Sequence, residues 1–182
     1  METVTLTKTD FNDNGKYIGS RDLASLNAHL QIEANLGWCM FSKLNVAGRI
    51  VAKSGTSIKV GESIKAGESI EAGTLIEAGT SIEAGWSIEA GASIEAGASI
   101  KAGASIKAGE SIKAGASIEA MLSIVCKKAI SAKLRIFAGL CSWRLPTEDE
   151  IRIECERLEK GEVCFGTLIE TEKKLKEVES AE

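Results

Sequence analysis

Residues 57–120 decide the fold of this chain, and they read SIKVGESIKAGESIEAGTLIEAGTSIEAGWSIEAGASIEAGASIKAGASIKAGESIKAGASIEA. An isoleucine returns at every sixth residue from Ile58 to Ile118, within a unit that reads Ser-Ile-(Glu/Lys)-Ala-Gly-x. A six-residue period fits neither the helical turn of about 3.6 residues nor the alternation of one long strand. Short strands separated by bends and wound repeatedly give such a period. The stretch therefore predicts a solenoid.

Each position of the unit has an expected place. In Ile94-Glu95-Ala96-Gly97, the isoleucine and the alanine share one side of a short strand, so both should point inward. Glu95 lies between them and should point to water. Gly97 has no side chain and tolerates the bend. The position after the glycine varies most, and Trp86 occupies it once, which indicates an outward place at the bend.

The repeat resembles the hexapeptide-repeat, left-handed β-helix family. The pattern of that family is an aliphatic residue, then Gly, Ala, Glu or Asp, two free residues, a small residue and one more free residue. Residues 94–99 match this pattern at each place, and the resemblance covers about two thirds of the chain. It implies a mostly β, single-chain parallel β-helix with three hexads in each triangular coil, so that residues 18 apart stack on one another.

We divide the chain into three parts. Residues 1–25 are polar and should form an N-terminal cap, and residues 26–145 should form the solenoid, with its regular repeats at 57–120. A weaker six-residue frame precedes the repeats, with a small insertion expected near Lys53-Ser54-Gly55-Thr56. Residues 146–182 should form a helical cap or dimerisation segment. There the sequence Thr147-Glu148-Asp149-Glu150 is a capping box, from which a helix should run to about Lys160. Residues 162–168 should form a strand or turn, and a second, strongly charged helix should follow to the end. The weaker frame has at its isoleucine positions Leu26, Ile32, Trp38, Leu44 and Ile50.

Composition narrows the class of protein. The net charge of −4 argues against a general nucleic-acid binder or a binder of anionic membranes. No apolar run approaches about 20 residues, and the N-terminus lacks the features of a signal peptide. The five cysteines form no Cys-x-x-Cys pair, and their odd number would leave one unpaired in a set of disulfides. This pattern is typical of free thiols in a reducing cytosol. We therefore expect a cytoplasmic protein. The cysteines are Cys39, Cys126, Cys141, Cys155 and Cys164.

Few residues offer catalytic chemistry. The resemblance implies either acyl transfer from coenzyme A with a histidine base, or a zinc ion held by three histidines. The only histidine is His29, in the irregular first coils, and one histidine per chain does not supply a three-histidine zinc site unless three chains share it. We expect His29 to be structural, and we predict no enzyme activity, no cofactor and no metal.

Charged residues should stack into ladders if three hexads make a coil. The alternating ladder should fix the register among near-identical repeats, because opposite charges on neighbouring coils attract. Glu71, Glu77, Glu89 and Glu95 follow one another without lysine, and we interpret them as a solvated face or as an acidic docking surface for a basic protein partner. The basic stretch 127–144 has two interpretations, an anion-binding patch or a partner for the acidic tail. The three ladders are Lys59-Glu77-Glu95-Lys113, Lys65-Glu83-Lys101-Glu119 and Glu71-Glu89-Lys107.

The row that contains Trp86 should be apolar. In steps of 18 residues it reads Glu68, Trp86, Ala104, Leu122, Leu140. A contiguous apolar stripe marks a contact, so Trp86, Leu122 and Leu140 are candidate partner-binding residues. We favour a homodimer over a cover by the C-terminal segment of the same chain or a heterologous partner.

These observations favour a non-catalytic β-solenoid protein-interaction module. Its design resembles that of pentapeptide-repeat proteins that imitate DNA. A phage or mobile-element inhibitor of a host nucleic-acid-handling or defence complex, of the anti-CRISPR kind, is one hypothesis for its role. The alternatives are an acyltransferase-like enzyme and a self-assembling structural filament.

Overall fold

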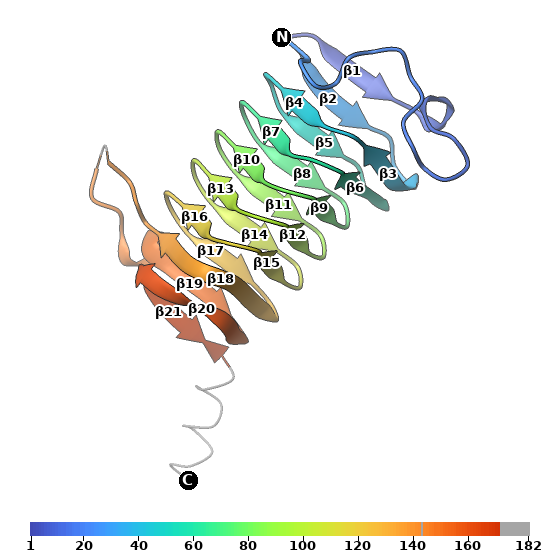
Figure 1. The fold of residues 1–182 in the computed structure, drawn as a ribbon. Helices are drawn as coiled ribbons and strands as arrows, with labels where there is room; N and C mark the ends of the chain where they lie inside the picture. The colour runs from blue at the N-terminus through green and yellow to red at the C-terminus, as the bar shows by residue number, and fades with distance from the viewer. Residues whose placement is uncertain (143, 172–182) are drawn as a thin grey trace.

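The protein is a parallel β-solenoid of about eight turns (Figure 1). The computed structural model describes residues 1–142 and 144–171. Successive strands lie on successive sides of the coil, and each regular strand pairs with the strand 18 residues away. The fold predicted from the six-residue repeat is therefore confirmed, including the stacking of three hexads per coil.

The strands form three faces, and within each face every strand pairs with the next one named. The first face holds β1 (Thr3–Leu6), β2 (His29–Ile32), β5 (Ile50–Ala52), β8 (Ile70–Ala72), β11 (Ile88–Ala90), β14 (Ile106–Ala108), β17 (Ile124–Cys126), β19 (Arg152–Cys155) and β21 (Thr167–Glu170). The second face holds β3 (Gly37–Phe41), β6 (Thr56–Val60), β9 (Ile76–Ala78), β12 (Ile94–Ala96) and β15 (Ile112–Ala114). The third face holds β4 (Leu44–Val46), β7 (Ile64–Ala66), β10 (Ile82–Ala84), β13 (Ile100–Ala102) and β16 (Ile118–Ala120).

One long strand joins the second and third faces near the C-terminal end. β18 (Ala129–Ala138) pairs with β15 through its first half and with β16 through its second half, so it turns a corner without interruption. β20 (Arg157–Phe165) runs beside β18 along both faces. The regular solenoid is thereby closed by coils that depart from the six-residue unit.

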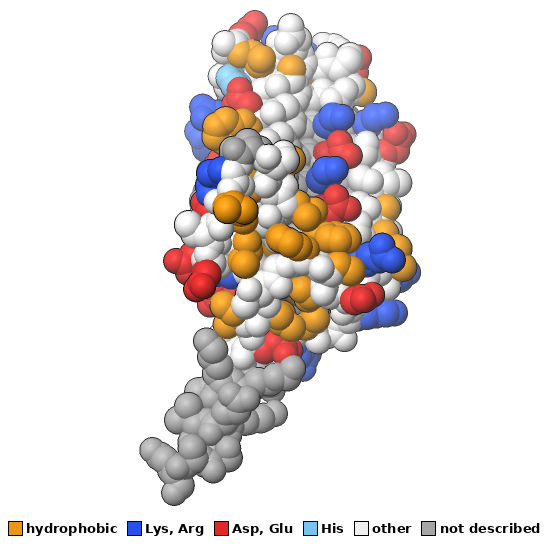
Figure 2. Space-filling view, turned by 90° about the vertical axis from the view of Figure 1, so that its left-hand side faces the viewer, with side chains coloured by type: hydrophobic (Ala, Val, Ile, Leu, Met, Phe, Trp, Pro, Cys, Tyr) orange, Lys and Arg blue, Asp and Glu red, His pale blue; other side chains and the backbone are white. Residues whose placement is uncertain are grey.

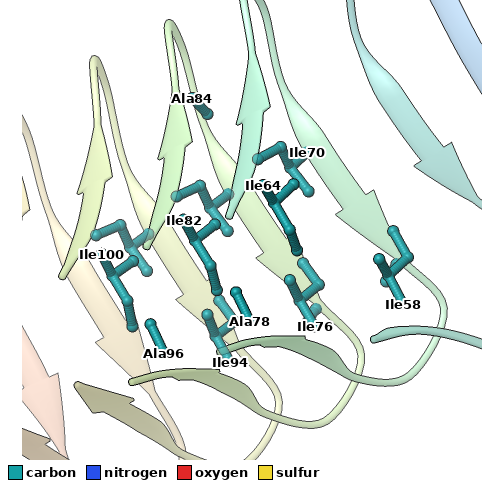
Figure 3. Packing of buried hydrophobic residues seen from close by; sticks show 14 of the residues in the cluster. Ile58, Ile64, Ile70, Ile76, Ala78, Ile82, Ala84, Ile94, Ala96 and Ile100 are labelled. Carbon is teal, nitrogen blue, oxygen red and sulfur yellow. The ribbon is translucent and has the colours of Figure 1, made fainter. Parts of the chain in front are cut away.

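The core is a set of isoleucine and alanine columns. The isoleucines of the repeats are at most 1 % exposed, and in each regular strand the residue between isoleucine and alanine points outward. Ile76, Ile94 and Ile112 stack in register on the second face, and Figure 3 shows part of this packing. Identical side chains at identical heights fill the interior in the same way from coil to coil, and this burial of apolar surface stabilises the fold.

The N-terminal segment already belongs to the solenoid. β1 pairs with β2 in full register, so residues 3–6, within the segment expected to form the N-terminal cap, lie on the first face. A short 3-10 turn, η1 (Lys8–Asp10), follows, and the segment then passes the outer edges of β3 and β4 through bridges at Lys16 and Leu26. These contacts cover the edges on which other strands would otherwise add.

The frame predicted for the first coils is partly wrong. The sequence frame puts Trp38 at an isoleucine position, but its neighbour Cys39 stacks on Ile58, and Trp38 lies outward with 41 % of its surface exposed. The register shifts because Leu30, and not Ile32, stacks on Ile50. The insertion expected near residues 53–56 is confirmed: β5 and β6 are separated by a turn in which Gly55 has a φ of 72°.

The C-terminal segment is not the helix that the sequence predicted. The capping box at Thr147 is present, yet it starts only a four-residue 3-10 turn, η2 (Glu148–Ile151), after which β19, β20 and β21 continue the solenoid to residue 170. The expected second helix lies largely outside the described residues. Tertiary pairing outweighs local helix propensity here, since Ile153 is fully buried against Ile124.

The last described coil is tighter than the others. Its inward residues Ile153, Leu158, Val163 and Leu168 are spaced by five residues instead of six. Bulges between β18 and β20 absorb the difference in length, and Gly161 adopts a φ of 120° there.

None of the helices in the described ranges has the length and apolarity to cross a membrane.

Candidate protein-binding surfaces

Trp86 begins a row of apolar residues at the corner between the third and first faces. Its N–H donates to the carbonyl oxygen of Glu68, the N–H of Ala104 donates to that of Trp86, and the N–H of Leu122 donates to that of Ala104. These bonds place Glu68, Trp86, Ala104 and Leu122 in line, as the 18-residue spacing predicted. The row then departs from that spacing, because the N–H that donates to the carbonyl oxygen of Leu122 is that of Gly139 and not that of Leu140. We name Trp86, Ala104, Leu122 and Leu140 the apolar corner.

The apolar corner is open to solvent in the described part of the chain. Trp86 exposes 66 % of its surface and Leu140 exposes 43 %, while Ala104 and Leu122 are half-buried. Figure 2 looks onto the side of the solenoid where this corner lies, and hydrophobic side chains gather along its middle and lower part. A contiguous apolar surface of this kind is typical of a contact with another molecule.

An insertion loop follows the apolar corner, a feature that the sequence did not predict. β18 ends at Ala138 on the third face and β19 begins at Arg152 on the first face, so residues 139–151 replace an ordinary corner. The loop projects from the coils on the left-hand side of Figure 1. The regular repeats at residues 57–120 carry no such insertion.

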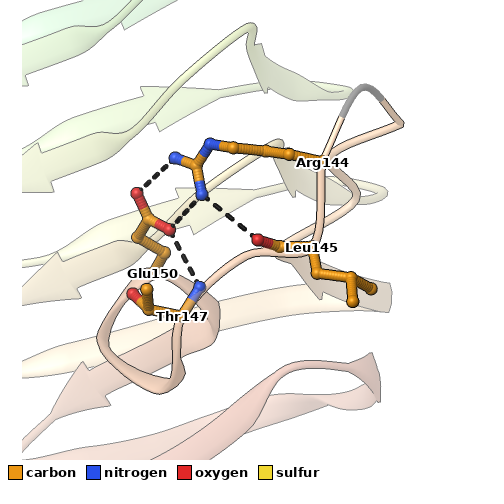
Figure 4. Close-up of polar contacts among 4 residues, drawn as sticks. All are labelled: Arg144, Leu145, Thr147 and Glu150. Carbon is orange, nitrogen blue, oxygen red and sulfur yellow. Dashed lines mark hydrogen bonds and ion pairs between the residues drawn. The ribbon is translucent and has the colours of Figure 1, made fainter.

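A charged clamp joins the middle of this loop to its C-terminal part (Figure 4). The guanidinium of Arg144 donates to both carboxylate oxygens of Glu150, at 2.6 and 2.5 Å, and also to the carbonyl oxygen of Leu145 at 3.3 Å. The N–H of Thr147 donates to the same carboxylate at 2.9 Å. The hydrogen bond from Arg144, followed by that from Thr147, lowers the pKa of Glu150 to about 2. The clamp therefore persists at neutral pH.

Leu145 is the most exposed large apolar side chain of the described residues, at 93 %. It follows Arg144 directly, so the clamp fixes its backbone while its side chain stays in water. Scattered exposed leucines are ordinary on protein surfaces. This one lies on the loop that replaces the corner after Ala138.

The charge ladders form as predicted, and they are neutralised on two of the three faces. On the second face Lys59 pairs with Glu77 and Lys113 pairs with Glu95, each at 2.8 Å. On the third face the alternating ladder contains the pairs Lys65–Glu83 at 3.3 Å and Lys101–Glu119 at 3.6 Å. All eight side chains are about one-third exposed or more, so each pair contributes little stability and serves mainly to favour one register.

The four glutamates proposed as one acidic surface do not lie together. Glu77 and Glu95 are on the second face and are paired with lysines, whereas Glu71 and Glu89 stack on each other on the first face. Successive hexads occupy different sides of the coil, which separates residues six apart in the sequence. The acidic docking surface is thus reduced to Glu71 and Glu89.

Part of the basic stretch near the C-terminal end is paired with acidic residues. Lys128 pairs with Glu110 at 3.2 Å, Arg144 pairs with Glu150, and Arg135 lies opposite Glu162 in the register of β18 and β20. Two of these partners, Glu150 and Glu162, belong to the acidic segment after residue 146. The interpretation of this stretch as a partner for the acidic segment agrees with those contacts.

His29 makes a structural hydrogen bond. The N–H of Arg49 donates to its Nδ1 at 3.1 Å, which leaves the proton of a neutral ring on Nε2. The imidazole also packs over Gly48, where any Cβ would collide with the ring. Glu68 lies 3.9 Å from Nδ1. In this tautomer Nδ1 is the ring nitrogen with a lone pair, and that lone pair already accepts the N–H of Arg49.

The cysteines are all free thiols. Burial raises the pKa of Cys39 to about 11, that of Cys126 to about 12 and that of Cys155 to about 11, so these three are thiols, not thiolates, at neutral pH. Cys126 takes the alanine position of its hexad, opposite Ala108, as predicted. Among residues 1–142 and 144–171, no group of three or more His, Cys, Asp or Glu is arranged to hold a metal ion.

Comparisons with known proteins do not identify this chain. No family model, no curated protein and no solved structure matches it. Its function is therefore inferred from the surfaces described above.

Proposed function

We propose that the protein is a non-catalytic β-solenoid interaction module whose apolar corner docks against another protein surface. One observation carries this proposal: the corner presents Trp86 with 66 % of its surface in water, at the head of a stacked apolar row. Tryptophan is enriched at the centres of protein interfaces because it buries a large area with few rotatable bonds.

A second copy of the chain is the partner that best fits the corner. A two-fold axis across the row, between Ala104 and Leu122, would bring Ala104 opposite Leu122 of the partner subunit and Trp86 opposite the segment that begins at Gly139 of the partner subunit. Large side chains then face smaller ones along the row. The loop that carries Leu145 would extend the contact beyond the corner itself.

The variant Trp86→Glu is expected to convert the dimer into a folded monomer. The added carboxylate would be desolvated within the contact without a partner. Sedimentation equilibrium should give a mass near 19.2 kDa for this variant and twice that mass for the wild type. Far-ultraviolet circular dichroism should be unchanged.

Thr80→Glu is the matched control for this experiment. Thr80 follows Gly79 as Trp86 follows Gly85, but it lies at the corner between the second and third faces. The substitution Thr80→Glu adds the same charge at an equivalent bend and should leave the dimer intact. If Thr80→Glu dissociated the protein as completely as Trp86→Glu, a general charge effect would replace the corner contact as the explanation.

His29→Gln is expected to leave the protein functionally intact. The amide oxygen of glutamine accepts the N–H of Arg49 as Nδ1 does, and a non-catalytic protein needs no imidazole. Partner binding and the urea unfolding midpoint should both remain close to those of the wild type. Complete loss of activity in a variant that still folds would instead support an acyltransferase-like enzyme, for which coenzyme A binding by calorimetry is the direct test.

Inhibition of a host nucleic-acid-handling or defence complex is the biological role that we attach to this module. A rigid rod with charged ladders and an apolar docking corner, in a chain with few candidates for catalysis, supports such a role by occupying a partner's surface. A pull-down from the native host, with Trp86→Glu as the negative control, tests it. A filament-forming protein would instead show light scattering that grows with concentration.

A further inference from the structure

The first face carries a groove of about 880 Å³. Its lining includes Gly73, Gly91 and Gly109, which have no side chains, and the neighbouring Ala72 and Ala90. Glutamate and lysine residues of the same coils also line it. The groove follows the solenoid axis across the stacked coils.

Six charged residues line this groove, and within the described part of the chain five of them have no ion-pair partner within 4.0 Å. From the N-terminal to the C-terminal end these five are Lys53, Glu71, Glu89, Lys107 and Lys127. All five are exposed, and the sixth residue, Glu154, pairs with Arg152. The ladders on the other two faces contain four ion pairs, so the outward charges of the first face are the ones left open for a ligand.

We propose that this groove binds an extended peptide segment whose groove-facing residues read acidic, basic, acidic, acidic. A single arginine would bridge the carboxylates of Glu71 and Glu89, which stack directly on each other and repel in the free protein. The three acidic residues would meet Lys53, Lys107 and Lys127. The order of charges along the groove specifies the register of the peptide.

The dimensions of the groove fit seven peptide residues. Lys53 follows β5 and Lys127 follows β17, which are four coils apart in the order β5-β8-β11-β14-β17. Coils are spaced by roughly 4.8 Å, so the two lysines are separated by roughly 19 Å. An extended peptide advances about 3.3 Å per residue, and its alternate side chains face the same way. The third residue of such a peptide then lies at roughly 6.6 Å, between Glu71 and Glu89.

This inference deepens the proposed function by naming a partner chemistry, and it rests on that function only in requiring a protein partner. The groove lies on the first face, whereas the apolar corner lies where the third and first faces meet. A mutation can therefore change one without changing the other. Peptide binding should be the same in Trp86→Glu as in the wild type. The dimer proposal and the peptide-binding proposal can therefore be contradicted independently.

The test is fluorescence anisotropy of a labelled peptide, Asp-Ser-Arg-Ser-Asp-Ser-Asp, titrated with the full-length protein at low salt. Exposed charge pairs are individually weak and screened by salt, so binding should be salt-sensitive. A peptide of identical composition with arginine at its first position should bind about tenfold more weakly. The double variant Glu71→Gln, Glu89→Gln should weaken binding of the first peptide by about tenfold as well.

The double variant Glu77→Gln, Glu95→Gln is the control, because it removes the same charge from the second face, where both glutamates already pair with lysines. Its affinity for the peptide should match that of the wild type. Equal affinity for the two peptides, equal loss in both double variants, or no anisotropy change up to millimolar protein would each overturn the proposal.

Discussion

Replacing Ile94 with aspartate is expected to abolish folding. Ile94 is fully buried and stacks between Ile76 and Ile112, so the new carboxylate would enter a filled apolar column without a hydrogen-bond donor. Burying an unpaired charge costs several kcal/mol, and the lost isoleucine adds roughly 2–5 kcal/mol, a sum comparable with the whole stability of a domain. Circular dichroism should show loss of the β signal.

Glu95→Gln provides the control for Ile94→Asp, one residue along the same strand. Glu95 points outward and pairs with Lys113, with both side chains more than half exposed. Its replacement keeps the shape and leaves the urea unfolding midpoint nearly unchanged. If both substitutions destabilised the protein equally, the inward and outward positions of the hexad would have been assigned wrongly.

Gly97→Ala is expected to destabilise the solenoid by about 2–3 kcal/mol, although it adds a single methyl group. A Cβ at Gly97 would collide with the carbonyl oxygen of Gly79 in the preceding coil. That oxygen belongs to a backbone fixed by the stacked ladder, so neither coil can move aside without breaking hydrogen bonds. Urea unfolding followed by circular dichroism measures the loss.

Gly61→Ala is the matched control, since Gly61 occupies the same column two coils earlier. There the nearest atom to an added Cβ is the carbonyl oxygen of Ser42 at 3.6 Å, which is an ordinary van der Waals contact. The substitution should be neutral or slightly stabilising, because alanine restricts the unfolded chain. A similar loss in both variants would show that glycine is required for its backbone conformation and not for the close approach of coils.

The regular coils could be predicted from the sequence because one interaction repeats. Every inward isoleucine meets the same neighbours, so the pattern at Ile94 is also the pattern at Ile76 and Ile112. The positions of Trp86 and of the charge ladders then follow from the 18-residue spacing. Repetition removes the ambiguity that a single short strand would leave.

The ends could not be predicted in the same way. At the N-terminal end Ile32-Glu33-Ala34 imitates the repeat, yet tertiary register places Leu30 at the isoleucine position and turns Trp38 outward. At the C-terminal end the capping box at Thr147 is real, but strand pairing determines the structure of residues 152–170. The apolar residues that recur at every fifth position after Ile153 were the sequence pattern from which these strands could have been predicted.

The candidate site was predicted in part. The apolar row is visible in the sequence because Trp86, Ala104 and Leu122 are 18 residues apart. Leu145 could not be predicted, because an insertion loop has no periodicity and its exposure depends on the clamp between Arg144 and Glu150. The pairing of glutamates with lysines also depends on which face each hexad occupies.

The fluorescence of Trp86 in a single-tryptophan protein tests the central claim most directly. The variant Trp38→Phe, Trp143→Phe keeps Trp86 as its only tryptophan. The proposed contact predicts a blue-shifted emission, shielded from acrylamide, at concentrations where the protein sediments as a dimer, and a shift toward that of an indole in water on dilution. Emission of a fully exposed indole at every concentration, with a mass that stays at 19.2 kDa, would contradict it.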